Sequence, residues 1–299
     1  MKSSLKKTLL LVGGDARLTY TAKMLAKNCH DYEVKTLAVP DTASLTVSQD
    51  TLHYDILVLP VPTSTDGTTV FSVQSEAIPL ASLYDLANPH ALVLTGACRA
   101  DVRQGFLTAG LSVVDYMERE ELALANAVPT AEGAIQIAME KLPITLQGCF
   151  ALILGYGRLG MALVPRLKAL GVDTKIAARR SEVRAMAEML GFSTVCLSPV
   201  VLAACVSQTR LIINTIPSLI LTEELLSHVP ADSLIIDLAS RPGGTDFEAA
   251  KRLHRNVEWA LALPGKTSPQ TAGKHIGKTI LNILTDLTER GISRARPDR

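Results

Sequence analysis

The sequence is poor in several features that would assign it to other classes of protein. Aromatic residues make up only 4% of the chain, with a single tryptophan. No apolar run approaches the roughly 18 residues of a membrane-spanning helix. Lys and Arg number 30 against 29 Asp and Glu, so no excess of positive charge is present to neutralise a nucleic-acid backbone. We therefore expect neither a membrane protein nor a nucleic-acid-binding protein.

Secretion and metal-binding signals are also missing. The start of the chain, Met1–Lys7, lacks the apolar core and cleavage site of a signal peptide, which favours a cytoplasmic protein. The cysteines fall singly, without a CxxC pair, and this spacing favours reduced, buried thiols over a metal or redox site. The histidines are scattered as well, so no metal site is expected. The cysteines are Cys29, Cys98, Cys149, Cys196 and Cys205.

Short apolar runs alternate with helical patterns in two stretches of chain, which is typical of βαβ units with a parallel sheet. In the first stretch the pattern predicts strands at 8–14, 33–39, 54–61, 91–96 and 112–116, with helices near 16–28 and 99–109. In the second it predicts strands at 149–155, 173–179, 193–197, 211–216, 233–239 and 257–263, with helices near 158–170, 181–190 and 246–254.

A length of 299 residues suits two domains. We predict a substrate-side α/β domain over residues 1–128 plus about 275–299 and a nucleotide-binding domain over 146–270. Pro129 and Thr130 can open a connecting helix over 129–145, and another helix is expected over about 268–289. The expected fold class is α/β, with two Rossmann-like, doubly wound parallel-sheet domains and an interdomain cleft.

The strongest local motif is LILGYGRLG at 152–160, where a strand runs into GxGxxG and then a helix. Gly155 allows the tight turn, Gly157 lets the backbone approach a pyrophosphate, and Gly160 lets the helix pack on the sheet. A turn that serves only packing is the alternative. The predicted dinucleotide contacts are Gly155, Tyr156, Gly157, Arg158, Leu159 and Gly160.

The end of the next strand distinguishes the two nicotinamide cofactors. An NAD site places Asp or Glu there to bind the ribose 2′-OH. This sequence instead reads Ala178, Arg179, Arg180, Ser181. Guanidinium groups and a hydroxyl suit a 2′-phosphate, although the same arginines would also serve as solvated surface charge. The sequence therefore predicts NADP, with NAD bound more weakly.

Two later strand ends are expected on the nicotinamide side. The first carries Asn214, Thr215, Ile216 and Pro217, and the second carries Asp237, Ala239, Ser240 and Arg241. For Asp237 the capping of a turn is an equal alternative.

Strand ends of the first domain are polar too. They are Gly13–Arg17, which includes Asp15, then Thr63, Ser64 and Thr65, and then Thr95 and Gly96. Hydroxyls, glycine amides and an arginine suit a carboxylate-bearing small molecule, but ordinary turn chemistry explains the same residues.

No acid/base dyad is evident, and hydride transfer asks little of the protein beyond orientation, a proton route and electrostatics. The candidate acid/base groups are Glu132, Asp15, Asp237 and His275. Glu132 and Asp237 are the preferred catalytic candidates. Each of these groups also has a structural alternative, which for Glu132 is a first-turn carboxylate that complements the helix dipole.

Together these motifs resemble the family of dipicolinate synthase A subunits from endospore-forming bacteria. The resemblance runs from about residue 8 to 285, and its later motifs are more specific than the glycine fingerprint. The motifs are GGDAR (13–17), PTAEGAI (129–135), LGYGRLGM (154–161), AARRS (177–181), NTIPSLIL (214–221), DLASRPGGTDF (237–247) and LPGKTSPQTAG (263–273).

The resemblance implies a reaction and a partner. The family is similar in fold to NAD(P)-dependent dehydrogenases and works with a flavoprotein-like B subunit of the same synthase, in the mother-cell cytoplasm during sporulation. From a branch of the lysine pathway it would oxidise 4-hydroxy-tetrahydrodipicolinate, via dihydrodipicolinate, to dipicolinate, with hydride transfer to NADP. Arg17 and Arg241 are then expected to clamp carboxylates. The implied neutral donors are Thr63, Ser64, Thr95, Thr130 and Ser240.

Two other functions stay open on the sequence. One is a different dehydrogenase of a small carboxylic acid, of the shikimate or ornithine type. The other is a non-catalytic nucleotide-sensing or scaffold protein, which the missing acid/base dyad leaves open. A homo-oligomer is compatible with either.

Overall fold

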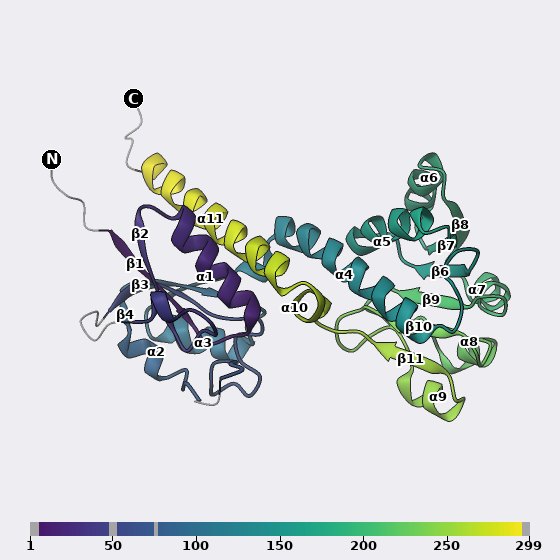
Figure 1. Ribbon diagram of the computed structural model, residues 1–299, viewed down its shortest axis with the longest axis horizontal. Coiled ribbons are helices and arrows are strands. Elements are labelled where there is room, and N and C mark those ends of the chain that lie inside the picture. Colours follow the sequence, from purple (N-terminus) through teal and green to yellow (C-terminus); the bar gives the residue numbers. More distant parts are fainter. Residues whose placement is uncertain (1–5, 48–52, 75–76, 295–299) are drawn as a thin grey trace. The chain divides into compact units, whose positions relative to one another are not determined.

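The computed structural model describes residues 6–47, 53–74 and 77–294, and the chain divides into two units (Figure 1). Unit 1 consists of Met1–Asn126 together with Ser268–Arg299, and unit 2 of Ala127–Thr267. Of the segment without signal-peptide features, residues 1–5 lie outside the described residues. Within the described part of the chain, no helix combines the length and apolarity needed to cross a membrane.

Unit 1 is built on five parallel strands in the order β2-β1-β3-β4-β5. They are β1 (Lys7–Val12), β2 (Tyr32–Leu37), β3 (Tyr54–Val58), β4 (Ala87–Thr95) and β5 (Ser112–Asp115). Its helices are α1 (Ala16–Asn28), α2 (Ser82–Asp85), α3 (Ala100–Thr108) and α11 (Pro269–Arg294), with short 3-10 turns η1 (Ala43–Leu45) and η2 (Tyr116–Glu118). The order reverses between β1 and β3, so ligand binding is expected beyond the carboxyl ends of these strands.

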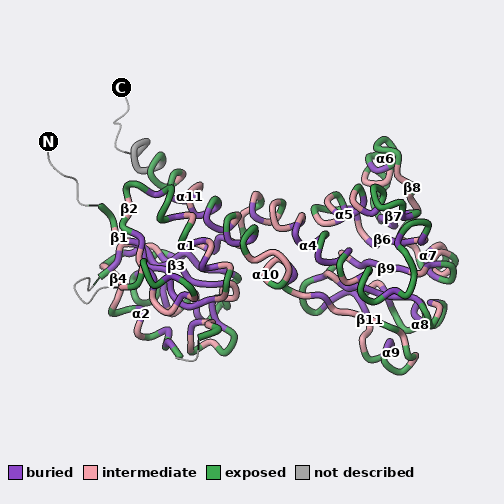
Figure 2. Tube along the Cα trace, viewed as in Figure 1, coloured by how far each residue is buried: buried purple, intermediate pink, exposed green. Residues whose placement is uncertain are grey.

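Helices cover both faces of this sheet, which explains why its strands are apolar throughout rather than alternating. α1 and α11 pack on the face that carries Leu9 and Leu11, and α2 and α3 on the face that carries Leu10 and Val12. All four side chains are completely buried. Figure 2 shows the same concentration of buried residues in the strands.

The C-terminal helix α11 belongs to unit 1, where it lies along α1 (Figure 1). Its apolar face, which includes Ile276, Ile280 and Leu284, is buried in the same core cluster as α1. Gly277 lets the two helices approach closely, because a side chain at that position would press against Met24. The chain thus returns to its first unit after completing the second.

Unit 2 has six parallel strands in the order β11-β10-β9-β6-β7-β8. They are β6 (Phe150–Leu154), β7 (Asp173–Ala178), β8 (Ser193–Cys196), β9 (Leu211–Asn214), β10 (Leu234–Asp237) and β11 (Asn256–Trp259). The helices are α4 (Glu120–Lys141), which begins in unit 1, α5 (Arg158–Ala169), α6 (Ser181–Met189), α7 (Pro199–Val206), α8 (Glu223–Ser227), α9 (Phe247–Arg252) and α10 (Leu263–Thr267). Counted within the unit, this is the 3-2-1-4-5-6 order of the Rossmann fold.

Both faces of this sheet are covered as well. Side chains from α4, α5 and α6 pack on one face, and side chains from α7, α8 and α9 on the other. The predicted class, α/β with two parallel, doubly wound sheets, is confirmed.

Two predicted elements were placed wrongly. Pro129 does not open the connecting helix, because α4 starts at Glu120 and the proline lies inside it. The stretch before the proline is rich in Glu, Leu and Ala, which are strong helix formers. The strand predicted over 257–263 ends at Trp259, and Leu263 begins the helix α10.

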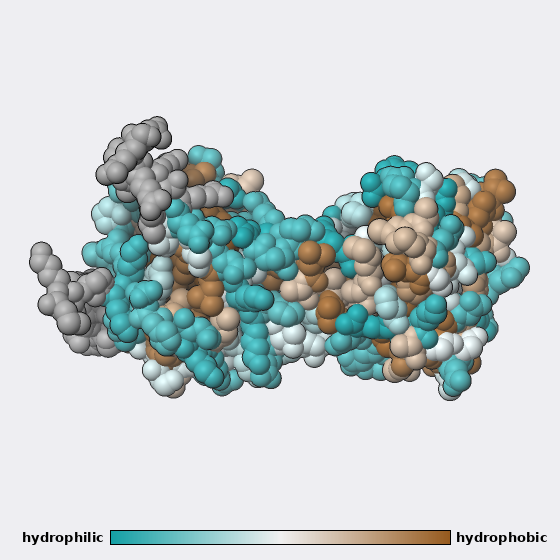
Figure 3. All heavy atoms as spheres, turned by 90° about the horizontal axis from the view of Figure 1, so that it is seen from above, coloured by the Kyte–Doolittle hydropathy of each residue, from teal (hydrophilic) through white to brown (hydrophobic). Residues whose placement is uncertain are grey.

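The helix α7 was not predicted at all. Its sequence, PVVLAACV, is apolar all round and therefore carries no 3.6-residue periodicity. It nevertheless lies at the surface, where Val200 is 83% exposed. Hydrophilic residues cover much of the molecular surface seen in Figure 3, with apolar patches between them.

Candidate functional site

The glycine turn after β6 lies at the switch point of unit 2, between β6 and β9. Gly155 has a φ of +95°, and a side chain there would collide with the Thr215 hydroxyl. Thr215 is itself fixed by hydrogen bonds from its N–H, 2.9 Å, and its hydroxyl, 2.8 Å, to the Leu154 carbonyl. A Cβ on Gly160 would lie 2.6 Å from the Gly155 carbonyl oxygen. Both glycines are therefore required by packing.

Gly157 differs from these two glycines. It is exposed and caps the N-terminus of α5, and a Cβ built on it would meet no described atom within 4 Å. Packing therefore does not explain this glycine. Open space beside the first N–H groups of a twelve-residue helix is what a pyrophosphate needs, so the turn fits a dinucleotide.

Two side chains of the glycine turn, Tyr156 and Leu159, pack into the core of unit 2. Tyr156 is buried, which raises the pKa of its hydroxyl, and its ring lies 6.2 Å from that of Phe192. Leu159 packs against the core. Arg158 is exposed at the start of α5. The predicted dinucleotide contacts thus form one turn and one helix start, with the two apolar side chains serving the core.

The segment after β7 exposes two arginines and no carboxylate at the position where NAD sites carry one. Arg180 is close to Glu182, with 3.5 Å between Nε and Oε1, and both side chains are 66% exposed. The Arg179 side chain is exposed and forms no hydrogen bond or ion pair with any described residue. Ser181 begins α6, while Ala178 is buried at the strand end.

The predicted nicotinamide-side residues are connected by one buried carboxylate. Asp237 accepts hydrogen bonds from Asn214 Nδ2 (2.9 Å), Ala239 N–H (3.0 Å), Gly244 N–H (2.9 Å) and the Thr245 hydroxyl (2.7 Å). Its side chain is completely buried. Three of these bonds come from the loop 238–245, so the Asp237 carboxylate holds that loop in place.

Asn214 shapes the neighbouring loop in the same way. Its amide donates to the Ile216 carbonyl and accepts from the Ile216 N–H, both at 3.1 Å. Pro217 follows and is exposed. Thr215, Ile216 and Pro217 therefore present backbone and apolar surface beside the glycine turn.

The loop after β10 exposes Ser240 and Arg241. The Arg241 guanidinium lies over the indole of Trp259, 5.2 Å from the ring centroid. No described residue accepts a hydrogen bond from it or forms an ion pair with it. The tryptophan at the end of β11 was missed in the sequence, although the rule that ligands gather at strand ends applies to it as well.

Glu132 and Thr130 both lie in α4, rather than at its start. Glu132 is exposed, and its carboxylate is 3.6 Å from Arg166 Nε on α5. Thr130 is half-buried. Glu132 therefore does not complement the N-terminus of α4, and it stays a prediction as an acid/base group.

In unit 1, Asp15 and Arg17 form one bound pair after β1. Asp15 caps α1 and accepts from Arg17 N–H at 2.9 Å, from Arg17 Nε at 3.0 Å and from Arg17 Nη2 at 2.8 Å. The same Nη2 also donates to the Val61 carbonyl. The Arg17 side chain is only 13% exposed. A substrate carboxylate would have to share this guanidinium with Asp15.

The predicted hydroxyl donors of unit 1 are turned inward. Thr63 is completely buried and exchanges hydrogen bonds with Gly96, from its hydroxyl to the Gly96 carbonyl and from the Gly96 N–H to its hydroxyl. Ser64 donates to Asp66, and Thr95 is also completely buried. These hydroxyls fix the loops after β3 and β4, while the exposed Thr65 and Ala97 form the surface there.

Asp115, at the end of β5, is a further organising residue that the sequence analysis missed. It accepts from the backbone N–H groups of Ala97 (3.1 Å), Cys98 (2.7 Å) and Met117 (2.9 Å). Burial, followed by the nearby Asp115 charge, raises the pKa of the Cys98 thiol. The carboxylate thus holds the loop after β4, and its place directly after a Val-Val strand run is the signal that could have found it.

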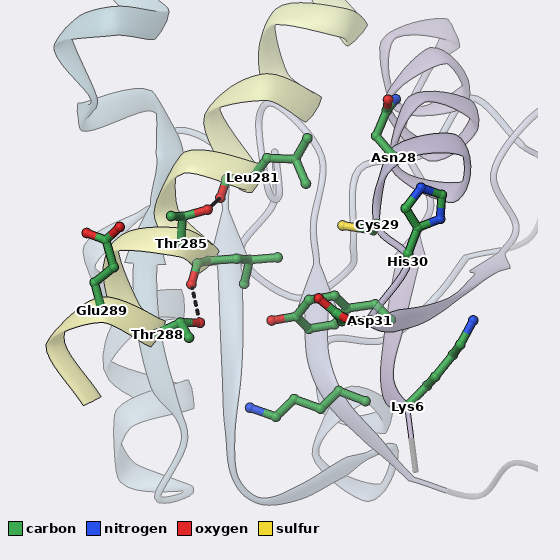
Figure 4. A pocket seen from close by; sticks show the side chains of 12 residues that line it. Lys6, Asn28, Cys29, His30, Asp31, Leu281, Thr285, Thr288 and Glu289 are labelled. Atoms are coloured by element: carbon green, nitrogen blue, oxygen red, sulfur yellow. Dashed lines mark hydrogen bonds between the residues drawn. The ribbon is translucent and has the colours of Figure 1, made fainter. Parts of the chain in front are cut away.

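Two pockets differ in their relation to the strand ends. One, of about 660 Å³, lies in unit 1 beside the amino ends of β1 and β2, between those strands and α11 (Figure 4). The other, of about 350 Å³, lies between α7 and α8 in unit 2. It is lined mainly by apolar side chains near the carboxyl ends of β8 and β9, namely Leu197, Pro199, Leu202, Ala203, Leu219 and Ile220. Only the second is on the side where such sheets bind ligands.

His275, the remaining acid/base candidate, lies in α11. Its Nδ1 is buried without a hydrogen-bond partner among the described residues. Burial, followed by the Lys278 charge, lowers its pKa. Among the described residues, no cluster of three or more His, Cys, Asp or Glu could hold a metal ion.

Two parallel sheets, with a glycine-rich turn at the switch point of the second, define a chain of the Rossmann-type dehydrogenase fold. A transhydrogenase from Sinorhizobium meliloti shares this fold with a TM-score of 0.72 at 15% identity, over 94% of each chain. Within that class the chain belongs to the family of dipicolinate synthase A subunits, as the next comparisons show.

The family assignment rests on relatives that match nearly the whole chain. The dipicolinate synthase A subunit of Bacillus subtilis (strain 168) is 31% identical over 288 residues, which covers 93% of this chain and 96% of the relative. Residues 8–117 match the family model of the N-terminal domain of dipicolinate synthase A subunits. The crystal structure of the dipicolinate synthase A subunit from Bacillus halodurans has a TM-score of 0.85 at 27% identity and covers 97% of this chain and 98% of that one.

Proposed function

We propose that this chain is an NADP-dependent oxidoreductase that forms dipicolinate. The substrate would be 4-hydroxy-tetrahydrodipicolinate, or the dihydrodipicolinate that it yields on loss of water. Dihydrodipicolinate and NADP⁺ then give dipicolinate, NADPH and a proton. The observation that supports this most strongly is the open space at Gly157, in a chain of the dipicolinate synthase family.

The proposed cofactor contacts follow the strand ends of unit 2. Bound NADP would accept the hydride. N–H groups at the start of α5 would hold its pyrophosphate, and Arg179, with help from Arg180 and Ser181, would bind the 2′-phosphate. The apolar pocket near Leu197 has the size and lining to take the adenine ring.

Arg179 and Arg241 support the proposed anion contacts because their guanidinium groups lack hydrogen-bond and ion-pair partners among the described residues. Every other arginine whose side chain the structure describes has an acidic or backbone partner or another interaction. The guanidinium groups of these two arginines have no hydrogen bond or ion pair with a described residue. An arginine without a protein partner can give both edges of its guanidinium to an anion, so we assign Arg179 to the phosphate and Arg241 to a substrate carboxylate.

Arg17 is proposed as the second carboxylate-binding arginine, with Asp15 as its positioning residue. The buried Thr63, Ser64 and Thr95 then support the loops rather than bind the substrate directly. Asp237 is assigned a positioning role for the same reason. Because the product ring is aromatic, the protein has mainly to orient the ring and release one proton, for which Glu132 stays the candidate.

A partner is proposed because the relatives are named as the A subunits of a synthase, which implies at least one other component. We infer a flavoprotein-like B subunit, as the family resemblance implies, which assists in supplying or dehydrating the substrate.

The test is direct. The purified chain, with and without the B subunit, is incubated with freshly made 4-hydroxy-tetrahydrodipicolinate and either NADP or NAD, while NADPH or NADH and dipicolinate are followed by absorbance. Equal amounts of dipicolinate and NADPH, with slower turnover on NAD, are expected. Nucleotide binding without turnover, even in the presence of the B subunit, would instead indicate a non-catalytic role. Turnover of shikimate or an ornithine-type substrate alone would indicate another dehydrogenase.

A further inference from the structure

An aromatic cluster lies directly beneath the proposed substrate arginine. The rings of Phe247 and Trp259 are stacked, with centroids 4.6 Å apart and planes 26° from parallel. The Arg241 guanidinium carbon lies 5.2 Å from the centroid of the same indole. The indole Nε1 donates to the Ala239 carbonyl at 3.0 Å. Trp259 is thus held both by a ring contact and by a hydrogen bond at its edge.

The loop that carries Arg241 is anchored at both ends. Ala239 before it and Gly244 after it donate their N–H groups to the buried Asp237 carboxylate. Between them the Gly243 N–H donates to the Ser240 carbonyl at 2.8 Å, and the side chains of Ser240, Arg241 and Pro242 are exposed. No described residue forms a hydrogen bond or an ion pair with the Arg241 guanidinium. Its contact with the indole face of Trp259 therefore fixes its position.

We propose that Trp259 is a positioning residue that holds the Arg241 guanidinium ready to bind a carboxylate of the substrate. The inference rests on the proposed function and adds a residue to its site. A cation over an aromatic face is bound through the π system, which leaves the N–H donors at the guanidinium edges available for an anion. A carboxylate from the protein would occupy those same donors, as Asp15 does for Arg17.

The test is a double-mutant cycle on substrate binding and turnover. The variants are Arg241→Ala, Trp259→Leu, Trp259→Phe and the double variant Arg241→Ala with Trp259→Leu. Substrate KM and kcat are measured for each at saturating NADP. Trp259→Leu is expected to raise KM about tenfold with little change in kcat, and Trp259→Phe about threefold, since Trp binds cations better than Phe does.

The double variant decides the question. If Trp259 acts through Arg241, the double variant has the KM of Arg241→Ala, whereas independent effects would multiply and overturn the proposal. NADPH affinity and far-UV circular dichroism serve as folding controls, and both should match the unchanged protein in Trp259→Phe. An unchanged KM in Trp259→Leu would also overturn the proposal.

A second readout works without turnover. Trp259 is the single tryptophan of the chain, so its fluorescence, excited at the red edge where dipicolinate does not absorb, reports on the guanidinium above it. Dipicolinate is expected to change this fluorescence saturably in the unchanged protein and not in Arg241→Ala. If the protein turns over no substrate but this response persists, the proposed function fails while the positioning role stands. If the unchanged protein is active but dipicolinate changes the fluorescence of Arg241→Ala as much as that of the unchanged protein, only the positioning role is overturned.

Discussion

Asn214 donates a hydrogen bond to Asp237 across 2.9 Å, and the two residues are register partners at the ends of the neighbouring strands β9 and β10. Both are completely buried. The bond ties together the two loops that follow these strands. Asp237, a catalytic candidate on the sequence, and Asn214, a predicted cofactor contact, therefore hold in place the loops that carry the exposed residues beyond them.

Replacing Asp237 with Asn should destabilise the protein. One of its two oxygens would become an NH₂ group facing donors, because Oδ1 accepts from Asn214 and Ala239, and Oδ2 from Gly244 and Thr245. We expect the free energy of unfolding to fall by about 1–3 kcal/mol, measured by urea denaturation. Asp232→Asn is the control, since Asp232 is 61% exposed and pairs at the surface with Arg210. Equal losses in both variants would refute the scaffold role.

Alanine at Gly157 should lower mainly NADPH affinity, whereas alanine at Gly160 should lower mainly the stability of the protein. Gly157→Ala adds a methyl group to open space, so stability should change by less than about 1 kcal/mol, whereas NADPH affinity should fall at least about tenfold because the phosphates lose their place. Gly160→Ala brings a methyl group against the Gly155 carbonyl and should cost about 1–3 kcal/mol of stability. Urea denaturation and calorimetric titration with NADPH separate the two effects. Unaltered NADPH binding by a folded Gly157→Ala protein would contradict the proposed phosphate site.

Removing both Arg179 and Arg180 as alanine variants should change cofactor preference. The double variant is expected to lose about 30-fold or more in NADPH affinity, while its NADH affinity changes less than about threefold, because only NADPH carries the 2′-phosphate. Titration calorimetry with each cofactor measures this. Arg184→Ala serves as the control, because that guanidinium donates to the Ala178 and Arg179 carbonyls instead. Parallel losses for NADPH and NADH would remove these arginines from cofactor selection.

His275 should make the protein sensitive to mild acid. Burial lowers its pKa in the folded state below the ordinary value of 6.5, so the unfolded chain binds the proton more readily. Stability contributed by the neutral ring is present above pH 6.5 and is lost as the pH falls below it, toward the lowered folded-state pKa. Urea midpoints compared at pH values above and below 6.5 should fall less on acidification in His275→Gln than in the unchanged protein. An identical pH dependence would show that another group is responsible.

The sequence predicted the strands and the glycine turn because they follow from local rules. Leu9–Val12 is predicted as a buried strand because every side chain is apolar, and Gly155 as a turn because it begins the GxGxxG spacing directly after a strand. The start of α4 could not be found in the same way, because proline is more frequent at the start of a helix than inside one, whereas Pro129 lies inside α4. The helix α7 could not be found because its sequence has no helical periodicity.

For the candidate site, the sequence predicted the positions of the residues at strand ends better than it predicted what their side chains contact. Arg179 and Arg241 follow the strand ends as predicted; both are exposed, and neither guanidinium has a hydrogen-bonded partner among the described residues. The hydroxyl of Thr63 and the carboxylate of Asp237 are buried instead, because a loop must satisfy its own N–H and C=O groups before it can offer any to a ligand. Which polar residue faces inward depends on contacts between loops distant in sequence, and Trp259 beneath Arg241 is such a contact.

Because α11 belongs to unit 1, the whole of unit 2 is synthesised before the chain of unit 1 is complete. Residues 127–267 leave the ribosome before the helix that covers α1 exists, so the middle of the chain can finish folding while the unit that began it is still missing a layer. Until α11 has been synthesised, it cannot cover the side of α1 that includes Met24. The newly made chain therefore carries an uncovered apolar surface for most of its synthesis.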